Sequence, residues 1–243
     1  MKHVDVVIIS WAKNEELLQV THQGLDSLFG SEPSGDVTFH AYIVETNQDV
    51  NYDHYNQSHR RHTTTTIHPN QTFGYHKFLN IGRRAGNSPY VVLCNSDLTF
   101  ENNWASTIIL AMEAHPQFLS ASPWCPQTQG DNKPHGTSLY AGYQVRGEIA
   151  GWCIFQQRKI YEILGELDER FTFWYCDNDY ALELQTKAIN HFLVPASVVN
   201  HHENMLGKTG NSLTSAEQSK ITVEQEKVFN DKWEKIFAQN GPA

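Results

Sequence analysis

Two short apolar runs separated by a helical pattern open the sequence, and this order constrains the fold more than any other feature. Residues 4–10 and 39–44 are rich in β-branched and aromatic side chains, which is typical of strands buried on both faces of a sheet. Between them, leucines recur at helical spacing from Leu17 to Leu28, and Gly30 follows. A strand, a helix and a second strand in succession predict a parallel sheet with helices on its faces.

The rest of the chain continues this α/β pattern. Apolar runs predict strands at 90–94 and 192–195, and helical spacing predicts helices at 75–84, 104–114 and 182–188. Residues 48–72 are polar and are expected to form a long irregular loop. Residues 123–150 are rich in Gly, Pro, Gln and Asn, which favours mobile loops around a site. Thr214 and Glu217 match a capping box, so a C-terminal helix is expected to begin there.

The composition excludes several classes of protein. Of the 243 residues 40% are hydrophobic, so the chain can bury a sizeable core and is not disordered. No segment approaches the roughly 20 apolar residues of a membrane span, and no secretory signal precedes the first strand. The four cysteines form no CxxC pair and are expected to be buried free thiols: Cys94, Cys125, Cys153 and Cys176. We therefore expect a cytoplasmic protein, in the host cell if its source is viral.

The net charge of −9 gives no general reason to bind nucleic acid, because contacts to phosphates need a concentrated basic face. One local exception is the run His59-Arg60-Arg61-His62, followed by Lys77, Arg83 and Arg84. These residues are expected to form either a solvated loop or a small anion-binding rim. The sequence also lacks GxGxxG and GxSxG, which weakens a dehydrogenase or an α/β-hydrolase interpretation.

Polar clusters follow three of the predicted parallel strands, at Ser10–Asn14, Glu45–Asn47 and Asn95–Asp97. In an open α/β sheet, ligands bind in the crevice beyond the carboxyl ends of the strands. A single cluster means little, since every strand must end in something polar. Three clusters together favour a binding cleft at this edge of the sheet.

Asn95-Ser96-Asp97 is the most specific of these clusters. A carboxylate directly after a buried strand can coordinate a hard divalent cation, which can neutralise a ligand's diphosphate. The alternative is an Asx-turn that only closes the strand. His201 and His202 follow another strand-like stretch, and a His with an Asp is a reasonable pair of ligands for Mn²⁺.

A second acidic cluster, Asp177-Asn178-Asp179, follows the aromatic run at 171–176. Acids framed by aromatic side chains indicate a desolvated general base beside a stacking platform. The alternative is that these acids sit at a helix N-terminus, where the helix dipole favours them, and both interpretations can hold together.

The order and spacing of these motifs resemble the GT-A fold nucleotide-sugar glycosyltransferases of the large family-2 type. Such proteins carry a DxD-like motif, an Asn-x-Gly helix before it and an aromatic–Glu-Asp-x-Asp segment after it. The resemblance runs from Val4 to about Trp233. It rests on the following segments: 10–16, 45–47, Phe73-Gly74, Asn80-Ile81-Gly82, 90–97, Gly151-Trp152, 173–179, a late His and 229–233.

The resemblance implies roles for the residues of the metal and diphosphate site. Asp97 matches the acid that holds the metal on the diphosphate, and His201 or His202 matches the late metal-binding His. Asn95 stands where the first acid of the DxD motif usually sits, with Ser96 between them. A metal site that leans on the His is therefore expected, occupied by Mn²⁺ or Mg²⁺.

The same resemblance implies a donor pocket. Glu45 matches the second-strand acid that contacts the nucleoside. Ser10, Trp11 and Asn14 match the first-strand loop around the base, and Asn80 belongs to the Asn-x-Gly helix. A nucleotide-diphosphate sugar, with a UDP-sugar as the first expectation, is the implied donor.

On the acceptor side, Asp177 matches the acid that usually serves as the general base, with Asp179 as its rival two residues on. Cys176 replaces the Glu that usually precedes this acid. Flat aromatic faces suit stacking on sugars or bases. The candidate acceptor wall consists of Gly151, Trp152, Trp174 and Tyr175.

The expected protein is thus a metal-dependent glycosyltransferase, a hexosyl- or pentosyltransferase that moves a sugar to an acceptor hydroxyl with inversion. Its expected fold is a mostly parallel, Rossmann-like central sheet with helices on both faces. A GT-A domain would span 1–213, with a nucleotide-sugar half at about 1–97 and an acceptor half at about 98–213. The C-terminal helix at 214–243 would pack on it. The sequence leaves the oligomeric state open.

Three alternatives remain at this point. The acceptor could be a saccharide, another small hydroxyl compound, or a hydroxymethylated base in phage DNA docked on the basic residues above. A non-catalytic sugar- or nucleotide-binding module is motivated by Asn95 and Cys176, which both replace acids. A nucleotidyltransferase shares the cleft, but the loop after the first strand lacks the Gly-rich, basic character that such enzymes normally show.

Overall fold

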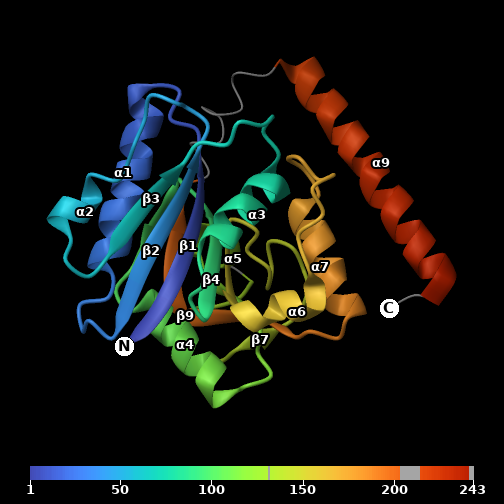
Figure 1. Ribbon diagram of the computed structural model, residues 1–243. Coiled ribbons are helices and arrows are strands. Elements are labelled where there is room, and N and C mark those ends of the chain that lie inside the picture. Colours follow the sequence, from blue (N-terminus) through green and yellow to red (C-terminus); the bar gives the residue numbers. More distant parts are fainter. Residues whose placement is uncertain (131, 203–213, 241–243) are drawn as a thin grey trace.

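The computed structural model describes residues 1–130, 132–202 and 214–240 (Figure 1). Four parallel strands form one half of its central sheet, in the order β3-β2-β1-β4. These are β1 (Lys2–Ser10), β2 (Val37–Glu45), β3 (Thr63–Ile67) and β4 (Tyr90–Asn95). Ser10 pairs with Glu45 and Ile9 with Asn95, so these three strands end at the same level.

The other half of the sheet is mixed. β8 (Cys153–Gln157) runs antiparallel to both β4 and β6 (Ser120–Trp124), and β9 (His191–His201) runs parallel to β6. Two short strands, β5 (Leu98–Phe100) and β7 (Tyr140–Ala141), pair antiparallel with β9. The β5–β9 pairing matters most, because it brings the end of β9 beside the segment that follows β4.

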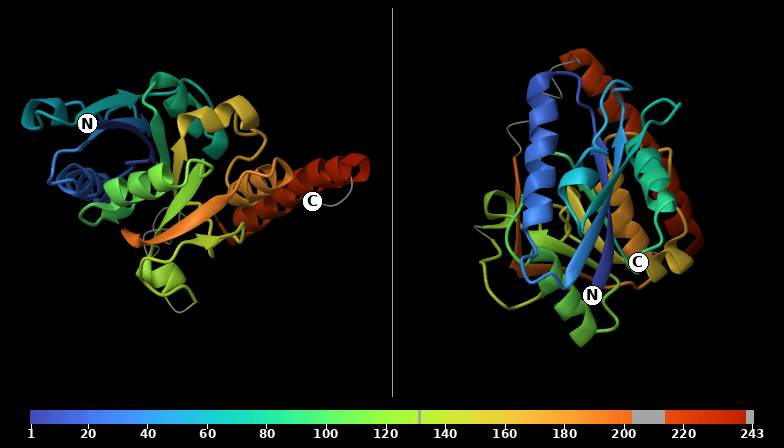
Figure 2. Two further views of the ribbon diagram at one scale, coloured as in Figure 1. Left: turned by 90° about the horizontal axis from the view of Figure 1, so that it is seen from below. Right: turned by 60° about the vertical axis from the view of Figure 1, so that its left-hand side comes forward.

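Helices cover both faces of the sheet, as expected from the sequence. Figure 2 shows α1 (Glu15–Gly30) and α3 (Tyr75–Ala85) on opposite sides of β1 and β2. The alternation of β1 explains this arrangement: Val6 belongs to a core cluster with side chains of α1 and α4 (Trp104–Ala114), whereas Val7 packs with Phe78 of α3. The remaining helices are α2 (Tyr55–Ser58), α5 (Pro126–Gln129), a 3₁₀ turn (Arg158–Ile160), α6 (Tyr161–Leu164), α7 (Cys176–Thr186) and α9 (Ser215–Asn240).

The polar stretch at 48–72 is not the irregular loop predicted from its composition, because it contains α2 and the edge strand β3. Three of the five residues of β3 are only partly buried, and four are threonines. A strand at the edge of a sheet needs no apolar run, which is why its sequence resembled a loop. Residues 123–150 likewise contain α5 and β7.

Two expectations for the termini and cysteines are confirmed. Glu217 accepts hydrogen bonds from the backbone N–H and the hydroxyl of Thr214, and the N–H of Glu217 donates back to the Thr214 hydroxyl over 3.3 Å, which is a capping box. All four cysteines are free and buried. None of the helices in the described ranges is long and apolar enough to cross a membrane.

Candidate active site

The loop after β1 is ordered by Glu45, at the end of β2. Its carboxylate has no exposed surface and accepts hydrogen bonds from the N–H groups of Ala12 (3.1 Å) and Asn47 (2.7 Å) and from the hydroxyl of Tyr52 (3.2 Å). Ser10 is also buried, with its hydroxyl 3.3 Å from that of Tyr52. Glu45 therefore acts on the backbone of the loop, and it is the loop that reaches the surface.

Trp11 gives this loop an exposed aromatic surface. Its side chain is 43% exposed, and the Lys13 ammonium lies 4.5 Å from the ring centroid. Asn14, in contrast, accepts a hydrogen bond from the N–H of Leu17 over 2.9 Å and so caps α1. Both residues were predicted to line the nucleotide-sugar pocket, but they differ in the structure. The indole of Trp11 is exposed and available for stacking, whereas the side chain of Asn14 caps the N-terminus of α1.

Asp97 and His201 face each other across the β5–β9 pair. Asp97 Oδ1 lies 3.5 Å from His201 Nε2, and both side chains are largely buried. Trp152 stacks on the His201 ring, with centroids 5.3 Å apart. His202 turns the other way, with Nε2 3.1 Å from the hydroxyl of Thr99. Of the two candidate histidines, the structure brings His201 to Asp97.

This pair fits a divalent cation. Asp97 Oδ1 is buried and accepts no hydrogen bond within the part of the chain that the structure describes. A buried carboxylate oxygen without a donor is costly unless a cation or ligand satisfies it. Across the described residues, no group of three or more His, Cys, Asp or Glu could hold a metal. Within the described residues, Asp97 and His201 are the two candidate ligands, and oxygen atoms of a bound ligand or water would add to the coordination.

Asn95 is held by Tyr75, the first residue of α3. The Tyr75 hydroxyl donates to Asn95 Oδ1 over 2.8 Å and lies 3.4 Å from the carbonyl oxygen of Gly151. Burial raises the pKa of Tyr75 well above its usual value, so the hydroxyl keeps its proton. The next residue, Ser96, packs with its backbone against Gly24 of α1. A Cβ atom on Gly24 would lie 3.1 Å from the Ser96 carbonyl oxygen.

Asp177 lies in the first turn of α7, against Gly151. A Cβ on Gly151 would meet Asp177 Cβ at 2.7 Å, so this approach requires glycine. Both residues, with Tyr75 and Tyr180, line a cavity of about 20 Å³, which is large enough for one water molecule. Burial raises the pKa of the Asp177 carboxyl above its usual value.

Asp179 points to a different neighbour. It is 2% exposed, it forms an ion pair with Lys232 Nζ (2.7 Å), and it accepts a hydrogen bond from the Trp233 indole (2.9 Å). Burial raises the pKa of Asp179 to about 6. Asp179 therefore binds α9 and does not line the cavity beside Asp177.

Of the aromatic residues predicted to form the acceptor wall, one is exposed, one is buried and one packs against α9. Trp174 is 41% exposed, as is Phe173, whose ring meets it edge to face at 4.9 Å. Trp152 is instead buried on His201, and the Tyr175 ring packs on Phe229 of α9. We call residues 170–175, which include Phe173, Trp174 and Tyr175, the aromatic loop.

Two further exposed aromatic residues near this edge, Phe173 and Phe73, belong to segments noted in the sequence but were not included in the predicted acceptor wall. Phe73 precedes α3, whose first N–H, that of Tyr75, donates to the carbonyl oxygen of Thr172 over 2.8 Å. Phe73 therefore lies on the segment that runs beside the aromatic loop. Aromatic residues in Gly-containing loops beyond the strand ends were the available signal.

Asn80 is used inside the protein. It has no exposed surface, and its side chain bonds both the N–H (3.1 Å) and the carbonyl oxygen (2.9 Å) of Leu167. This amide pairs α3 with the segment before the aromatic loop. The Asn-x-Gly helix thus contributes to the site by its position.

Two residues of the predicted basic cluster are paired with glutamates. Arg83 and Arg84 pair with Glu166, and Arg84 also contacts Glu169. Arg60 and Arg61 precede β3, at the end of the parallel strands opposite Asp97. The basic cluster predicted from sequence is therefore partly neutralised, and these four arginines lie away from Asp97.

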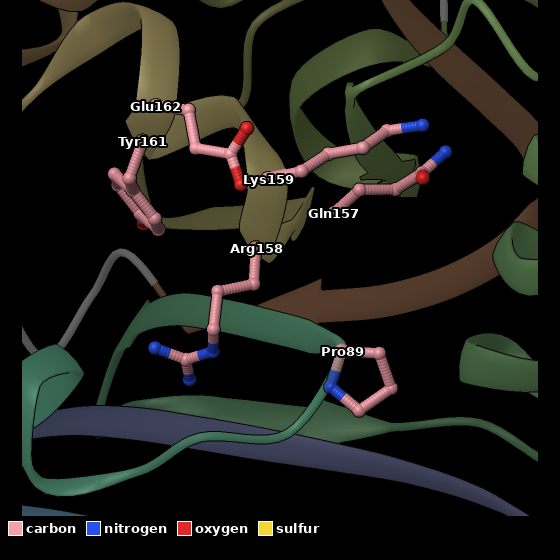
Figure 3. Close-up of a pocket in the computed structure, with 6 residues that line it drawn as sticks. All are labelled: Pro89, Gln157, Arg158, Lys159, Tyr161 and Glu162. Carbon is pink, nitrogen blue, oxygen red and sulfur yellow. The ribbon is translucent and has the colours of Figure 1, made fainter.

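A larger concavity, of about 580 Å³, also lies at that opposite end of the sheet (Figure 3). Pro89 precedes β4 and Gln157 ends the antiparallel strand β8, so both mark the edge away from Asp97. Arg158, which is labelled in Figure 3, forms an ion pair with Asp5 over 2.6 Å. This open surface brings together none of the predicted site residues.

Comparison with known proteins identifies the fold. No protein-family model matches the sequence, and no curated protein is significantly similar to it. Among solved structures, the chain is similar to GalNAc-T7 with UDP, GalNAc and Mn²⁺, with a TM-score of 0.62 and 13% identity over 82% of this chain and 43% of that one. It is similar to TarS from S. aureus, with a TM-score of 0.59 and 10% identity over 93% and 70% of the two chains. It is also similar to the mannosyltransferase PcManGT from Pyrobaculum calidifontis with GDP-Man and Mn²⁺, with a TM-score of 0.58 and 15% identity over 82% and 56%.

These similarities confirm the predicted fold. The chain has the GT-A, Rossmann-like architecture, with a mostly parallel sheet, helices on both faces and a C-terminal helix. It spans less than half of the GalNAc-T7 chain and just over half of the mannosyltransferase chain.

Proposed function

We propose that this protein is a metal-dependent glycosyltransferase that takes its sugar from a nucleotide-diphosphate donor. The observation that carries the proposal is the buried Asp97 oxygen, which faces His201 and lacks a hydrogen-bond donor among the described residues. This pair lies at the strand-end edge, where α/β sheets bind ligands. The neighbours with the same fold include complexes with UDP and Mn²⁺ and with GDP-Man and Mn²⁺, which supports a nucleotide and a cation together.

In this proposal Asp97 and His201 hold Mn²⁺ or Mg²⁺. When bound, the cation offsets the negative charge that develops on the departing diphosphate. Trp11 offers its exposed ring to the base, and the Glu45-ordered loop keeps that ring in place. A UDP-sugar is the donor we propose first.

Asp177 is the proposed general base. Its carboxylate takes the proton from an acceptor hydroxyl, whose oxygen forms the new bond to the anomeric carbon while the bond to the diphosphate breaks. Attack from the side opposite the diphosphate inverts the anomeric centre. The raised pKa of Asp177 supports this role, because burial makes the carboxylate a stronger base.

We propose a saccharide as the acceptor. Phe173 and Trp174 present flat apolar faces to solvent, as sugar binding requires. The ion pairs of Arg83 and Arg84 with Glu166 and the net charge of −9 weigh against a DNA acceptor. The sugar that is transferred, hexose or pentose, the domain halves at about 1–97 and 98–213, and the cytoplasmic location remain predictions.

A non-catalytic binding module is the second candidate, and one observation favours it. Asn95 replaces an acid, and its side-chain oxygen already accepts a hydrogen bond from Tyr75. Hydrolysis of UDP-sugars and GDP-sugars with Mn²⁺ separates the two candidates. A transferase releases nucleotide slowly even with water as the acceptor, and the release requires Asp97, whereas a binding module shows Mn²⁺-dependent affinity without release.

A further inference from the structure

The C-terminal helix α9 contacts the aromatic loop at its backbone. Gln225 of α9 is 6% exposed and bonds two backbone groups of the loop. Its Oε1 accepts from the N–H of Thr172 over 2.7 Å, and its Nε2 donates to the carbonyl oxygen of Arg170 over 3.2 Å. A single buried amide thus satisfies a donor and an acceptor on the same extended segment, as a neighbouring strand would.

The opposite side of the same backbone faces α3. The carbonyl oxygens of Phe171 and Thr172 accept from the first two N–H groups of α3, those of His76 (3.4 Å) and Tyr75 (2.8 Å). The loop backbone therefore lies between two helices.

Other contacts from α9 reinforce this position. Phe229 packs against Tyr175 with ring centroids 5.2 Å apart, and Lys232 lies between Asp179 (2.7 Å) and Glu183 (2.8 Å) of α7. Tyr175 has a left-handed backbone (φ 62°), which a non-glycine residue adopts only when its surroundings enforce it. Figure 1 shows α9 lying alongside α7.

From these contacts we propose that Gln225 is a positioning residue for the acceptor: it sets the aromatic loop so that Phe173 and Trp174 present their faces beside Asp177. The proposal rests on the proposed transferase function. It makes α9 part of the acceptor site, although none of the residues predicted for that site from sequence lies on α9. Gln225 touches neither substrate nor metal, so its effect is confined to the side chains that the loop carries.

The test compares Gln225→Met with Gln239→Met in the full-length chain. Methionine keeps the length of glutamine and removes both hydrogen bonds, and Gln239 is an exposed residue on the same helix. Losing one such bond costs about 1 kcal/mol, which corresponds to roughly a fivefold change. We expect amide hydrogen exchange at Thr172 to accelerate at least about fivefold in Gln225→Met and to stay at the wild-type rate in Gln239→Met.

The kinetic arm separates positioning from general damage. With UDP-sugar donor, Mn²⁺ and methyl glycosides as acceptor probes, Gln225→Met should raise the acceptor KM about fivefold. UDP release into water should keep its wild-type rate. Unchanged exchange at Thr172, or equal losses in transfer and in hydrolysis, would overturn the proposal.

A third variant covers the outcome in which Gln225→Met fails to fold. Gln225→Glu keeps the side-chain oxygen that accepts the hydrogen bond from Thr172 N–H and loses the N–H group that donates to the Arg170 carbonyl. Hydrogen exchange at Thr172 should therefore remain slow, while the KM for the methyl glycoside rises. If instead the wild-type protein neither binds nor hydrolyses any UDP- or GDP-sugar with Mn²⁺, the transferase function is wrong. In that case the exchange measurement still decides whether Gln225 positions the loop.

Discussion

Asp97 Oδ1 lies 3.5 Å from His201 Nε2, although Asp97 follows β4 and His201 ends β9, far away in the sequence. The pairing of β5 with β9 creates this contact, since Leu98 is the register partner of His201. The same pairing distinguishes His201, which faces Asp97, from His202, whose side chain contacts Thr99. Every prediction for the metal follows from this geometry.

His201→Gln should weaken Mn²⁺ binding in the presence of UDP at least about tenfold, because even residues that only support metal ligands are worth that much. His202→Gln is the matched control, since its ring contacts Thr99. Titration of free Mn²⁺ by electron paramagnetic resonance measures both. Equal losses in the two variants would show that β9 does not select the ligand.

Asp177→Asn should keep the fold and the donor affinity and lose transfer by roughly 100- to 10,000-fold, the usual contribution of general base catalysis. Asparagine has nearly the same size but takes no proton at neutral pH. Gly151→Ala should also reduce transfer, because its Cβ would meet Asp177 at 2.7 Å. Transfer rates and UDP affinities are measured together, and an Asp177→Asn enzyme with wild-type transfer would assign the base elsewhere.

Asp179→Ala should destabilise the protein by about 2 kcal/mol, because the Trp233 indole N–H and Lys232 lose a buried partner. The free energy of unfolding in urea measures this loss. Asp231→Ala, at an exposed position of α9, should stay within about 0.5 kcal/mol of the wild type. A catalytic defect in Asp179→Ala without loss of stability would contradict a structural role.

The stability that His76 and His191 contribute should fall on acidification between about pH 6.5 and pH 4. Burial lowers the pKa of His76 and of His191 to about 4, so in this range the unfolded chain binds protons that the folded chain does not. Each histidine contributes a slope of ~1.4 kcal/mol per pH unit within the window and almost none above it. Urea unfolding across this range should show a shallower slope in His191→Asn. The same slope in both proteins would mean that His191 is protonated in the folded state.

Much of the fold could be predicted because buried parallel strands have a distinctive composition. The apolar runs at 4–10, 39–44 and 90–94 correspond to β1, β2 and β4, and the helix at 104–114 has the predicted bounds. β3 was missed because an edge strand of threonines has no apolar face to reveal it. The antiparallel strand β8 follows no helix and breaks the pattern on which the prediction relied.

The sequence predicts where the candidate site lies better than it predicts which side-chain atoms are free to bind a ligand. A strand end places Glu45 close to the expected cleft, and the resemblance assigns Asn80 of α3 to it. The sequence does not show that loop backbone already uses the polar atoms of both residues. Two adjacent histidines are equivalent until β9 pairs with β5. Gln225 gave no signal, because a glutamine in an amphipathic helix is ordinary until a partner backbone lies opposite it.

The measurement that tests the transferase proposal most directly is the melting temperature with UDP and UDP-sugars, with and without Mn²⁺, in the wild type and in Asp97→Asn. A ligand that binds only the folded state raises the melting temperature by mass action. We predict that Mn²⁺ increases the shift that each nucleotide produces in the wild type, and that this increase disappears in Asp97→Asn while the protein without ligand keeps its stability. A Mn²⁺-dependent shift that persists in Asp97→Asn, or its absence from the wild type with every nucleotide-sugar, would contradict the proposed site.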